Sequence, residues 1–228
     1  MLVIDNLTIG YDDKPVLSGL TVSMESGSIH GLVGLNGQGK TTLLNVILGK
    51  LEPWNGSVLW DGKKPGKSDL ALLETEPWFY PKITGREYLK VMAFHNREAN
   101  IDDWNDWLTL PLDDLTESYS SGMKKKLAIM GTFLRKTPLV LLDEPFNNLD
   151  LEAVARTSSL LTRMKESGRT IIVTSHILGS LTSICDKIHD LYGGTIRHSF
   201  SPDEFDGLED KLVRNRIEKA EQKLEKLS

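Results

Sequence analysis

A short glycine-rich stretch holds the first residues whose types and spacing could do chemistry. Residues 34–42 contain three glycines followed by Lys40 and Thr41. Glycine lets the backbone approach an anion closely because it has no Cβ, and lysine adds a point charge for outer phosphates. The threonine hydroxyl is a ligand for Mg²⁺. The stretch predicts a polyphosphate site formed by Gly34, Leu35, Asn36, Gly37, Gln38, Gly39, Lys40, Thr41 and Thr42.

The flanking sequence supplies the elements that such a loop needs. An apolar run at 29–33 precedes it, and apolar residues recur at helical spacing over 43–48. A strand that ends in a glycine-rich loop and opens into a helix aims backbone N–H groups and the positive end of the helix dipole at one spot. We therefore interpret 34–42 as a nucleotide loop rather than as a glycine turn before an ordinary helix.

Two carboxylates end a second apolar run. Residues 139–142 are all apolar and lead directly into Asp143 and Glu144, which is typical of a buried parallel strand that delivers charge to its C-terminal end. Asp143 suits a water-mediated contact to Mg²⁺, and Glu144 suits a general base or a residue that positions the attacking water. A strand that simply runs into an acidic turn is the alternative, and the phosphate loop upstream favours the functional interpretation.

His176 ends a third apolar run, at 171–176. An isolated histidine at a strand end is more often structural than functional. If the strands that begin near residues 29, 139 and 171 are neighbours, however, their C-terminal ends converge. His176 would then reach the outermost phosphate and the water held by Glu144.

Composition restricts the class of protein. The 228 residues suit one large domain or a main domain with a small insertion. The contents of 39% hydrophobic and 26% charged residues are ordinary for a globular protein. A net charge of −5 argues against broad nucleic-acid binding, and we expect the cluster 124–126 to be a solvated helix face. Cys185 is the only cysteine, which excludes an internal disulfide and a cysteine-based metal site. We expect neither a secretion signal nor a membrane-spanning segment.

The order of the predicted elements is that of an α/β protein with a helical insertion. We predict strands at 2–4, 8–10, 20–24, 29–33, 58–60, 139–142 and 170–174, and helices at 87–97, 102–108, 121–135, 151–165 and 177–184. A charge-laced helix at 209–226 is expected to face solvent. The predicted domain organisation is one domain, with a core at 1–75 and 137–200, a helical subdomain at 76–136 and a C-terminal tail at 201–228.

Taken together, these motifs resemble the nucleotide-binding subunit of ATP-binding cassette (ABC) transporters over nearly the whole chain. Residues 34–42 resemble its Walker A loop, 139–144 its Walker B strand with the catalytic glutamate, and His176 its switch histidine. Residues 119–123 stand where the family has its LSGGQ signature, and 148–150 resemble the D-loop. The resemblance implies a P-loop NTPase core with a parallel sheet, an N-terminal antiparallel β subdomain and an inserted helical subdomain.

The resemblance also implies ATP and Mg²⁺ as cofactors. It gives phosphate binding to Lys40 and the loop amides, Mg²⁺ binding to Thr41 and Asp143, water activation to Glu144 and γ-phosphate sensing to His176. Tyr11 falls where the family places an aromatic residue that stacks on adenine. The other interpretation of Tyr11 is a hairpin tyrosine that packs on its neighbours.

The signature implies a second subunit. In the family this segment completes the ATP site of a partner, so Ser120, Ser121, Gly122 and Met123 would act in trans and Asp150 would lie in the seam. A plain helix N-cap is the alternative for the same residues. Ser121 replaces the first glycine of the signature and Met123 its glutamine, a form similar to that of many export-type members.

The largest departure from the family lies at 73–81, where the Q-loop glutamine is missing. We expect Thr75 at the position of this glutamine, and Glu74 or Glu76 as residues that could take over part of its contacts to Mg²⁺ and water. Two interpretations stay open for the aromatic cluster 78–80. It is either a groove for a coupling helix of a membrane subunit or core of the helical insertion.

The resulting hypothesis is an ATP hydrolase that powers a separate membrane permease from the cytoplasmic face of the membrane. It would act as a homodimer or with a paralogous subunit, with no nucleic-acid partner. A soluble ABC-type ATPase of translation or chromosome maintenance is the main alternative. Such relatives carry two cassettes in one chain or a long coiled coil before the signature. This chain has one cassette, and residues 40–120 are too short for a coiled-coil arm. An unrelated phosphate-loop kinase would lack the signature and the histidine.

Overall fold

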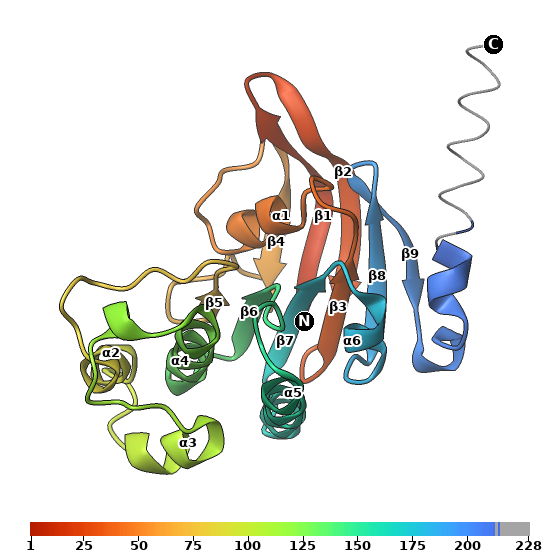
Figure 1. The fold of residues 1–228 in the computed structure, drawn as a ribbon. Coiled ribbons are helices and arrows are strands. Elements are labelled where there is room, and N and C mark those ends of the chain that lie inside the picture. The colour runs from red at the N-terminus through yellow and green to blue at the C-terminus, as the bar shows by residue number, and fades with distance from the viewer. Residues whose placement is uncertain (213, 215–228) are drawn as a thin grey trace.

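The structure is a computed structural model that describes residues 1–212 and 214. Two β-sheets and six α-helices make up most of this part of the chain (Figure 1). Residues 208–212 and 214 are helical, which agrees with the first residues of the helix predicted at 209–226. The rest of that prediction lies outside the described residues.

A three-stranded antiparallel sheet forms the N-terminal subdomain, in the order β2-β1-β4. Its strands are β1 (Leu2–Tyr11), β2 (Lys14–Met24) and β4 (Asn55–Trp60). The two short strands predicted at 2–4 and 8–10 are wrong as separate elements, because both belong to β1. The pairing register of β1 shifts between Ile4 and Leu7, and Asn6 has a φ of 47°. A bulge of this kind interrupts the pairing pattern while the strand continues.

The central sheet has six strands in the order β5-β6-β7-β3-β8-β9. The strands are β3 (Ile29–Val33), β5 (Leu70–Leu73), β6 (Leu139–Asp143), β7 (Thr170–Ser175), β8 (Lys187–Tyr192) and β9 (Thr195–Phe200). All neighbours are parallel except β9, which pairs antiparallel with β8. The three strands that carry the predicted motifs, β6, β7 and β3, are consecutive. Their C-terminal ends therefore meet at one edge, as the sequence predicts.

The helices are α1 (Lys40–Ile47), α2 (Gly85–Met92), α3 (Ile101–Leu108), α4 (Ser121–Leu134), α5 (Leu151–Glu166) and α6 (Leu178–Thr182). Helices α2, α3 and α4 lie within residues 76–136 and group beyond the β5 edge of the sheet (Figure 1). Helix α2 begins earlier than the predicted 87, because Thr84 caps it and Glu87 completes a capping box. It ends at Met92, not at 97, and α6 is shorter than the predicted 177–184.

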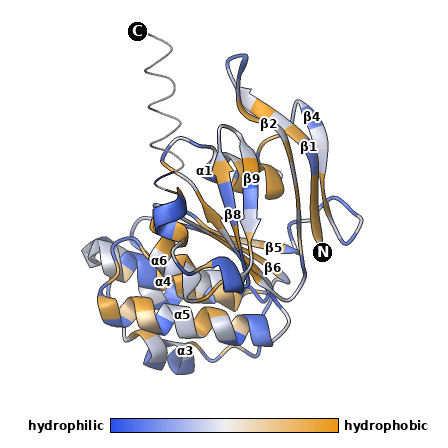
Figure 2. Cartoon of the chain, turned by 90° about the vertical axis from the view of Figure 1, so that its right-hand side faces the viewer, coloured by the Kyte–Doolittle hydropathy of each residue, from blue (hydrophilic) through white to orange (hydrophobic). Residues whose placement is uncertain are grey.

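Two hydrophobic clusters cover the two faces of the central sheet. Strand β6 shows the division, because Leu139 and Leu141 belong to the cluster beneath α1 and the N-terminal sheet, while Val140 and Leu142 belong to the cluster with α4 and α5. Successive side chains of a strand point to opposite faces. Hydrophobic and hydrophilic residues alternate along α3 and α5 (Figure 2), as expected of helices with one buried face.

A buried pair of histidines joins the neighbouring strands β3 and β8. His30 Nδ1 lies 3.2 Å from His189 Nε2, and His189 Nδ1 lies 2.7 Å from the hydroxyl of Ser199 on β9. His30 Nε2 lies 3.0 Å from the carbonyl oxygen of Glu25. A carbonyl oxygen only accepts, so His30 Nε2 carries the proton and donates to Glu25. In a neutral ring, His30 Nδ1 is then the acceptor, and His189 Nε2–H donates to it. His189 Nδ1 in turn accepts a hydrogen bond from the Ser199 hydroxyl. This chain of donors fits two neutral rings.

Acid is expected to destabilise the protein through this pair. Burial lowers the pKa of His189 to about 3 from its ordinary 6.5, and burial also lowers the pKa of His30. The unfolded chain therefore binds protons below about pH 6.5 while folded His189 stays neutral, so stability present above that pH is lost as the pH falls toward 3. At about pH 5 we expect His189 to account for about 2 kcal/mol of lost unfolding free energy.

Urea unfolding at about pH 7 and about pH 5 measures this loss. The His189→Asn variant should lose less stability on acidification than the wild type, by about 2 kcal/mol. His198→Asn is the matched control, because His198 lies exposed on β9. Equal losses in wild type and His189→Asn would contradict the assignment.

Candidate nucleotide-binding site

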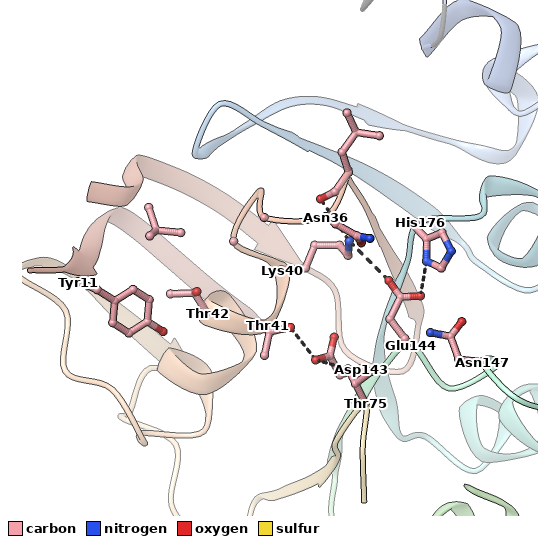
Figure 3. Close-up of a pocket in the computed structure, with 14 residues that line it drawn as sticks. Tyr11, Asn36, Lys40, Thr41, Thr42, Thr75, Asp143, Glu144, Asn147 and His176 are labelled. Atoms are coloured by element: carbon pink, nitrogen blue, oxygen red, sulfur yellow. Dashed lines mark hydrogen bonds and ion pairs between the residues drawn. The ribbon is translucent and has the colours of Figure 1, made fainter. Parts of the chain in front are cut away.

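A cavity of about 520 Å³ opens beside the C-terminal ends of β3, β6 and β7. Its lining unites residues from the first 42 positions with residues from 75 to 176 (Figure 3). The lining residues are Tyr11, Val16, Leu35, Asn36, Gly37, Gly39, Lys40, Thr41, Thr42, Thr75, Asp143, Glu144, Asn147 and His176. The structure thus brings together most of the residues that the sequence singles out.

The glycine-rich loop joins β3 to α1 and forms one wall of the cavity. Gly37 and Gly39 have φ angles of 80° and 101°, a region that favours glycine. Lys40, at the start of α1, folds back so that its Nζ donates to the carbonyl oxygen of Gly34 at 2.7 Å. The loop therefore presents backbone N–H groups, a helix N-terminus and a buried cation on one concave surface.

Two predicted loop residues lie outside the cavity lining. The Gln38 side chain turns away and accepts a hydrogen bond from the Gly193 N–H at 2.8 Å. Gly34 lies beneath the loop, where a Cβ would stand 2.7 Å from the carbonyl oxygen of Leu191. Nearby, the Ser18 N–H donates to the carbonyl oxygen of Gly194 at 2.9 Å. The turn between β8 and β9 therefore holds both the phosphate loop and β2 in place.

Glu144 lies between two basic side chains. Its Oε1 is 3.5 Å from Lys40 Nζ and its Oε2 is 3.0 Å from His176 Nδ1 (Figure 3). Glu144 has a φ of 48°, which is uncommon for a residue with a side chain. Its N–H donates to Thr174 Oγ1 at 3.0 Å, which helps to hold this conformation. The turn directs the carboxylate into the cavity instead of along the strand.

Asp143 accepts hydrogen bonds from three threonine hydroxyls. Thr41 and Thr75 donate to its Oδ2 at 2.7 and 2.8 Å, and Thr174 donates to its Oδ1 at 2.6 Å. The residue is only 3% exposed. Sequence reasoning missed Thr174, although a threonine near the C-terminal end of an apolar strand is a signal that can be sought. Thr174 contacts both acidic residues and fixes their relative position.

The Thr41 hydroxyl and the Asp143 carboxylate have the chemistry that a magnesium site needs. Mg²⁺ typically takes one or two carboxylates and completes its shell with waters and substrate phosphates. Among residues 1–212 and 214, no group of three or more His, Cys, Asp or Glu side chains could hold a metal ion. One hydroxyl and one carboxylate fit an ion that completes its shell with water and substrate phosphates.

Thr75, one of the residues predicted for the Q-loop position, lines the cavity and donates a hydrogen bond to Asp143. Glu74 does not line it, since its carboxylate pairs with Lys50 Nζ at 2.5 Å on the surface. Glu76 is also absent from the lining. Of the three candidates for the missing glutamine, the structure places only Thr75 at the site.

The expectation that residues 124–126 form a solvated helix face is wrong for Lys125. This side chain is 1% exposed, and its Nζ donates to the carbonyl oxygens of Thr75 at 2.7 Å and Glu74 at 3.3 Å. Helix α4 packs toward β5, so only one of the three lysines points to the sheet. Burial lowers the pKa of Lys125 to about 8.

The residues predicted to form the signature, 120–123, lie outside the cavity. Ser120 caps α4, with its Oγ accepting from the Met123 N–H at 3.2 Å. Asp150 caps α5 through the Ala153 N–H at 2.7 Å. A Cβ on Gly122 would stand 2.8 Å from the carbonyl oxygen of Asn148, so the two predicted motifs pack closely. Neither Ser120–Met123 nor Asp150 contributes to the lining.

Tyr11, Val16 and Asn147 complete the lining. Tyr11 is 50% exposed at the end of β1 and lies at the opposite end of the cavity from His176 (Figure 3). Val16, on β2, adds an apolar side chain to the lining, and Asn147 lies in the turn after β6. Sequence reasoning missed Val16 and Asn147, because a single valine or asparagine in a turn gives no periodic signal.

The fold and the cavity define a phosphate-loop nucleotide-binding domain. Comparison with known proteins agrees: the profile of the ABC transporter family matches residues 17–147. The chain is 31% identical to YcbN, an uncharacterised ABC transporter ATP-binding protein of Bacillus subtilis (strain 168), over 89% of this chain and 70% of the relative. It is 28% identical to SrtF of Streptococcus pyogenes, a lantibiotic transport ATP-binding protein, over 95% and 97%.

A solved structure of the ATP-binding subunit of an ABC transporter superposes with a TM-score of 0.83 at 27% identity, covering 90% of this chain and 91% of that one. The chain belongs to the ABC transporter family. It is an ATP-binding subunit, and its activity is ATP hydrolysis for transport. These similarities favour a transporter subunit over a soluble ATPase of translation or chromosome maintenance.

Proposed function

We propose that the cavity binds Mg·ATP and that Glu144 activates the water that attacks the γ-phosphate. The observation that carries this proposal is the convergence of Lys40 and His176 on one carboxylate, beside the Thr41–Asp143 pair. Thr41 and Asp143 would hold Mg²⁺, which neutralises phosphate charge when bound. Three strand ends and a phosphate loop thus supply the groups needed for phosphoryl transfer to water.

Each side chain has a separate task in this proposal. Lys40 now satisfies its ammonium with the Gly34 carbonyl oxygen and would turn toward the phosphates when ATP enters. Glu144 accepts a proton from water, or orients the water for in-line attack. His176 holds Oε2 of Glu144 and stands where the γ-phosphate would arrive. The positive φ of Glu144 directs the carboxylate toward this point.

A second ATP-binding subunit is expected to complete the site. Ser120, Ser121, Gly122 and Met123 combine a helix N-terminus with a hydroxyl, which suits an anion, yet they do not line the cavity of their own chain. We propose that they face the nucleotide of a partner, which is a second copy or a paralogue. Asp150 would lie at the seam between the two subunits.

A membrane permease is the other proposed partner, with this subunit peripheral on the cytoplasmic face. Within residues 1–212 and 214, no helix is long and apolar enough to cross a bilayer. Phe79 packs against the core and against Tyr88. Trp78 and Tyr80 are 64% and 60% exposed, and their rings meet edge to face with 4.6 Å between the centroids. One ring of the aromatic cluster thus belongs to the core, and the other two are exposed. The exposed pair, close to Thr75, suits contact with a permease segment.

Purification from native membranes tests the partner assignment. The chain should co-purify with an integral membrane protein, and the complex should hydrolyse ATP. Replacing Trp78 and Tyr80 by alanine should weaken the co-purification, because exposed aromatic pairs contribute strongly to interfaces. Recovery of the chain only with ribosomes or DNA would contradict the proposed membrane partner.

Tyr11→Ala is expected to weaken ATP binding about tenfold, because stacking of a base on an aromatic ring is worth about 1–3 kcal/mol. Tyr11→Phe keeps the ring and should bind ATP like the wild type. Titration with a fluorescent ATP analogue and competition by ATP measure both. If Tyr11→Ala binds as tightly as Tyr11→Phe, the tyrosine packs on its own hairpin and has no part in adenine recognition.

A further inference from the structure

A buried ammonium group lies at the junction of the helical subdomain and the central sheet, outside the cavity. Lys125, on α4, is 1% exposed and donates to two carbonyl oxygens, those of Glu74 and Thr75. Among residues 1–212 and 214 it forms no ion pair within 4.0 Å. A buried charge without a carboxylate partner is costly, and here charge-assisted hydrogen bonds to the backbone offset that cost.

The two carbonyl oxygens belong to the segment that reaches the cavity at Thr75. Thr75 follows β5, and its hydroxyl donates to Asp143 Oδ2 at 2.8 Å. The same oxygen accepts the Thr41 hydroxyl from the start of α1. A continuous series of contacts therefore runs from Lys125 through Thr75 and Asp143 to the phosphate loop.

Helix α4 connects this series to the signature. The helix begins at Ser121, so Lys125 lies about one turn inside it, two residues after Met123, the last residue that we assign to the partner's nucleotide. Threonine is shorter than the glutamine of the family. The Thr75 hydroxyl therefore reaches Asp143 only while the main chain at 74–75 is held close to Asp143. A displacement of about 1 Å between α4 and β5 would be enough to break a hydrogen bond of this length.

We propose that Lys125 is a positioning residue that fastens the main chain at 74–75 to α4 and thereby keeps the Thr75 hydroxyl on Asp143. The proposal rests on the proposed function, since it gives Asp143 a role at the nucleotide. It explains how a chain without the Q-loop glutamine links its helical subdomain to the acidic residues. Movement of α4 would change the hydrogen bonds of Asp143 through Lys125 and Thr75.

The test replaces Lys125 by methionine, which keeps most of the length of the stem and removes the donors. Two quantities are measured: amide hydrogen exchange of residues 74–80 without nucleotide, and the Mg²⁺ concentration that gives half-maximal ATP hydrolysis. Lys125→Met should speed the exchange about tenfold and raise the Mg²⁺ requirement about tenfold, because a hydrogen bond to a charged group is lost. ATP affinity without Mg²⁺ should change less than about twofold.

Three further variants separate positioning from a general loss of stability. Lys125→Arg keeps a charged donor and should restore most of both values, while Lys124→Met removes the same charge from the same helix and should leave both unchanged. In a Thr75→Ala background, Lys125→Met should add nothing to the Mg²⁺ requirement, since coupled residues are not additive. Lys125→Leu, which also has no donor, gives the same comparison if Lys125→Met does not fold.

Wild-type exchange and Mg²⁺ dependence in a folded Lys125→Met protein would overturn the proposal. An effect on Mg²⁺ that persists undiminished in the Thr75→Ala background would also overturn it, because Lys125 would then act by another route. The exchange measurement needs no nucleotide. It therefore decides whether Lys125 holds residues 74–80 even if the roles given to Asp143 and Glu144 prove wrong.

Discussion

The Glu144→Gln variant is expected to hydrolyse ATP at least about a hundredfold more slowly than the wild type, the usual loss when a general base is removed. Glutamine has the shape of glutamate, but it cannot accept the proton of the attacking water. The phosphate loop, Lys40 and Tyr11 are unchanged, so ATP affinity should stay close to that of the wild type. Phosphate release under single-turnover conditions and a nucleotide titration measure the two quantities separately.

The same variant should accumulate as a dimer in the presence of Mg·ATP, because the nucleotide that joins the subunits is not consumed. Size-exclusion chromatography with and without Mg·ATP detects this. Glu52→Gln is the matched control: Glu52 pairs with Lys64 on the surface, and neither residue lines the nucleotide cavity. Rapid turnover by Glu144→Gln would exclude the general-base role and leave the residue a merely structural neighbour of Lys40.

The Lys40→Ala variant should instead lose ATP affinity, by about a hundredfold, because hydrogen bonds to a charged donor contribute about 1.5–3 kcal/mol each. The buried Lys40 ammonium is the cation that lies in the phosphate loop itself. Its removal also leaves Glu144 without its basic neighbour on the loop side. Isothermal titration with ATP, with and without Mg²⁺, measures the change.

Lys50→Ala provides the comparison for Lys40→Ala. Lys50 follows α1 closely but pairs with Glu74 at the surface, away from the cavity lining, so its loss should leave ATP affinity within about twofold. Lys40→Arg should not restore binding fully, since the planar guanidinium does not replace a compact ammonium. Unchanged ATP binding by Lys40→Ala would refute the assignment of the phosphate loop.

The sequence was sufficient to predict the central architecture because its strongest motifs each follow a strand. Residues 34–42, Asp143, Glu144 and His176 are far apart in the chain, yet parallel strands bring their C-terminal ends to one edge. The prediction of the sheet therefore implied the convergence of these residues. Strands β5, β8 and β9 were not predicted: β5 is a four-residue run, and β8 carries the buried polar residues His189 and Asp190, which disguise its apolar pattern.

What the sequence did not predict depends on side-chain packing. Three consecutive lysines have the composition of a surface, and only the orientation of α4 shows that Lys125 faces the sheet. Thr174 is one of several threonines, and its contacts with Asp143 and Glu144 need the register of β6 against β7. Periodicity identifies the faces of an element, but it does not identify which polar side chain meets which partner.

The turn between β8 and β9 has a practical consequence for labelling the protein. Gly193 holds Gln38 of the phosphate loop, and a Cβ on Gly194 would stand 2.7 Å from the carbonyl oxygen of Val16. An affinity tag or fluorophore inserted there would disturb nucleotide binding although the turn looks like a convenient hairpin. The turn at Gly168, with open space around its Cβ position, is the better insertion point for a reporter.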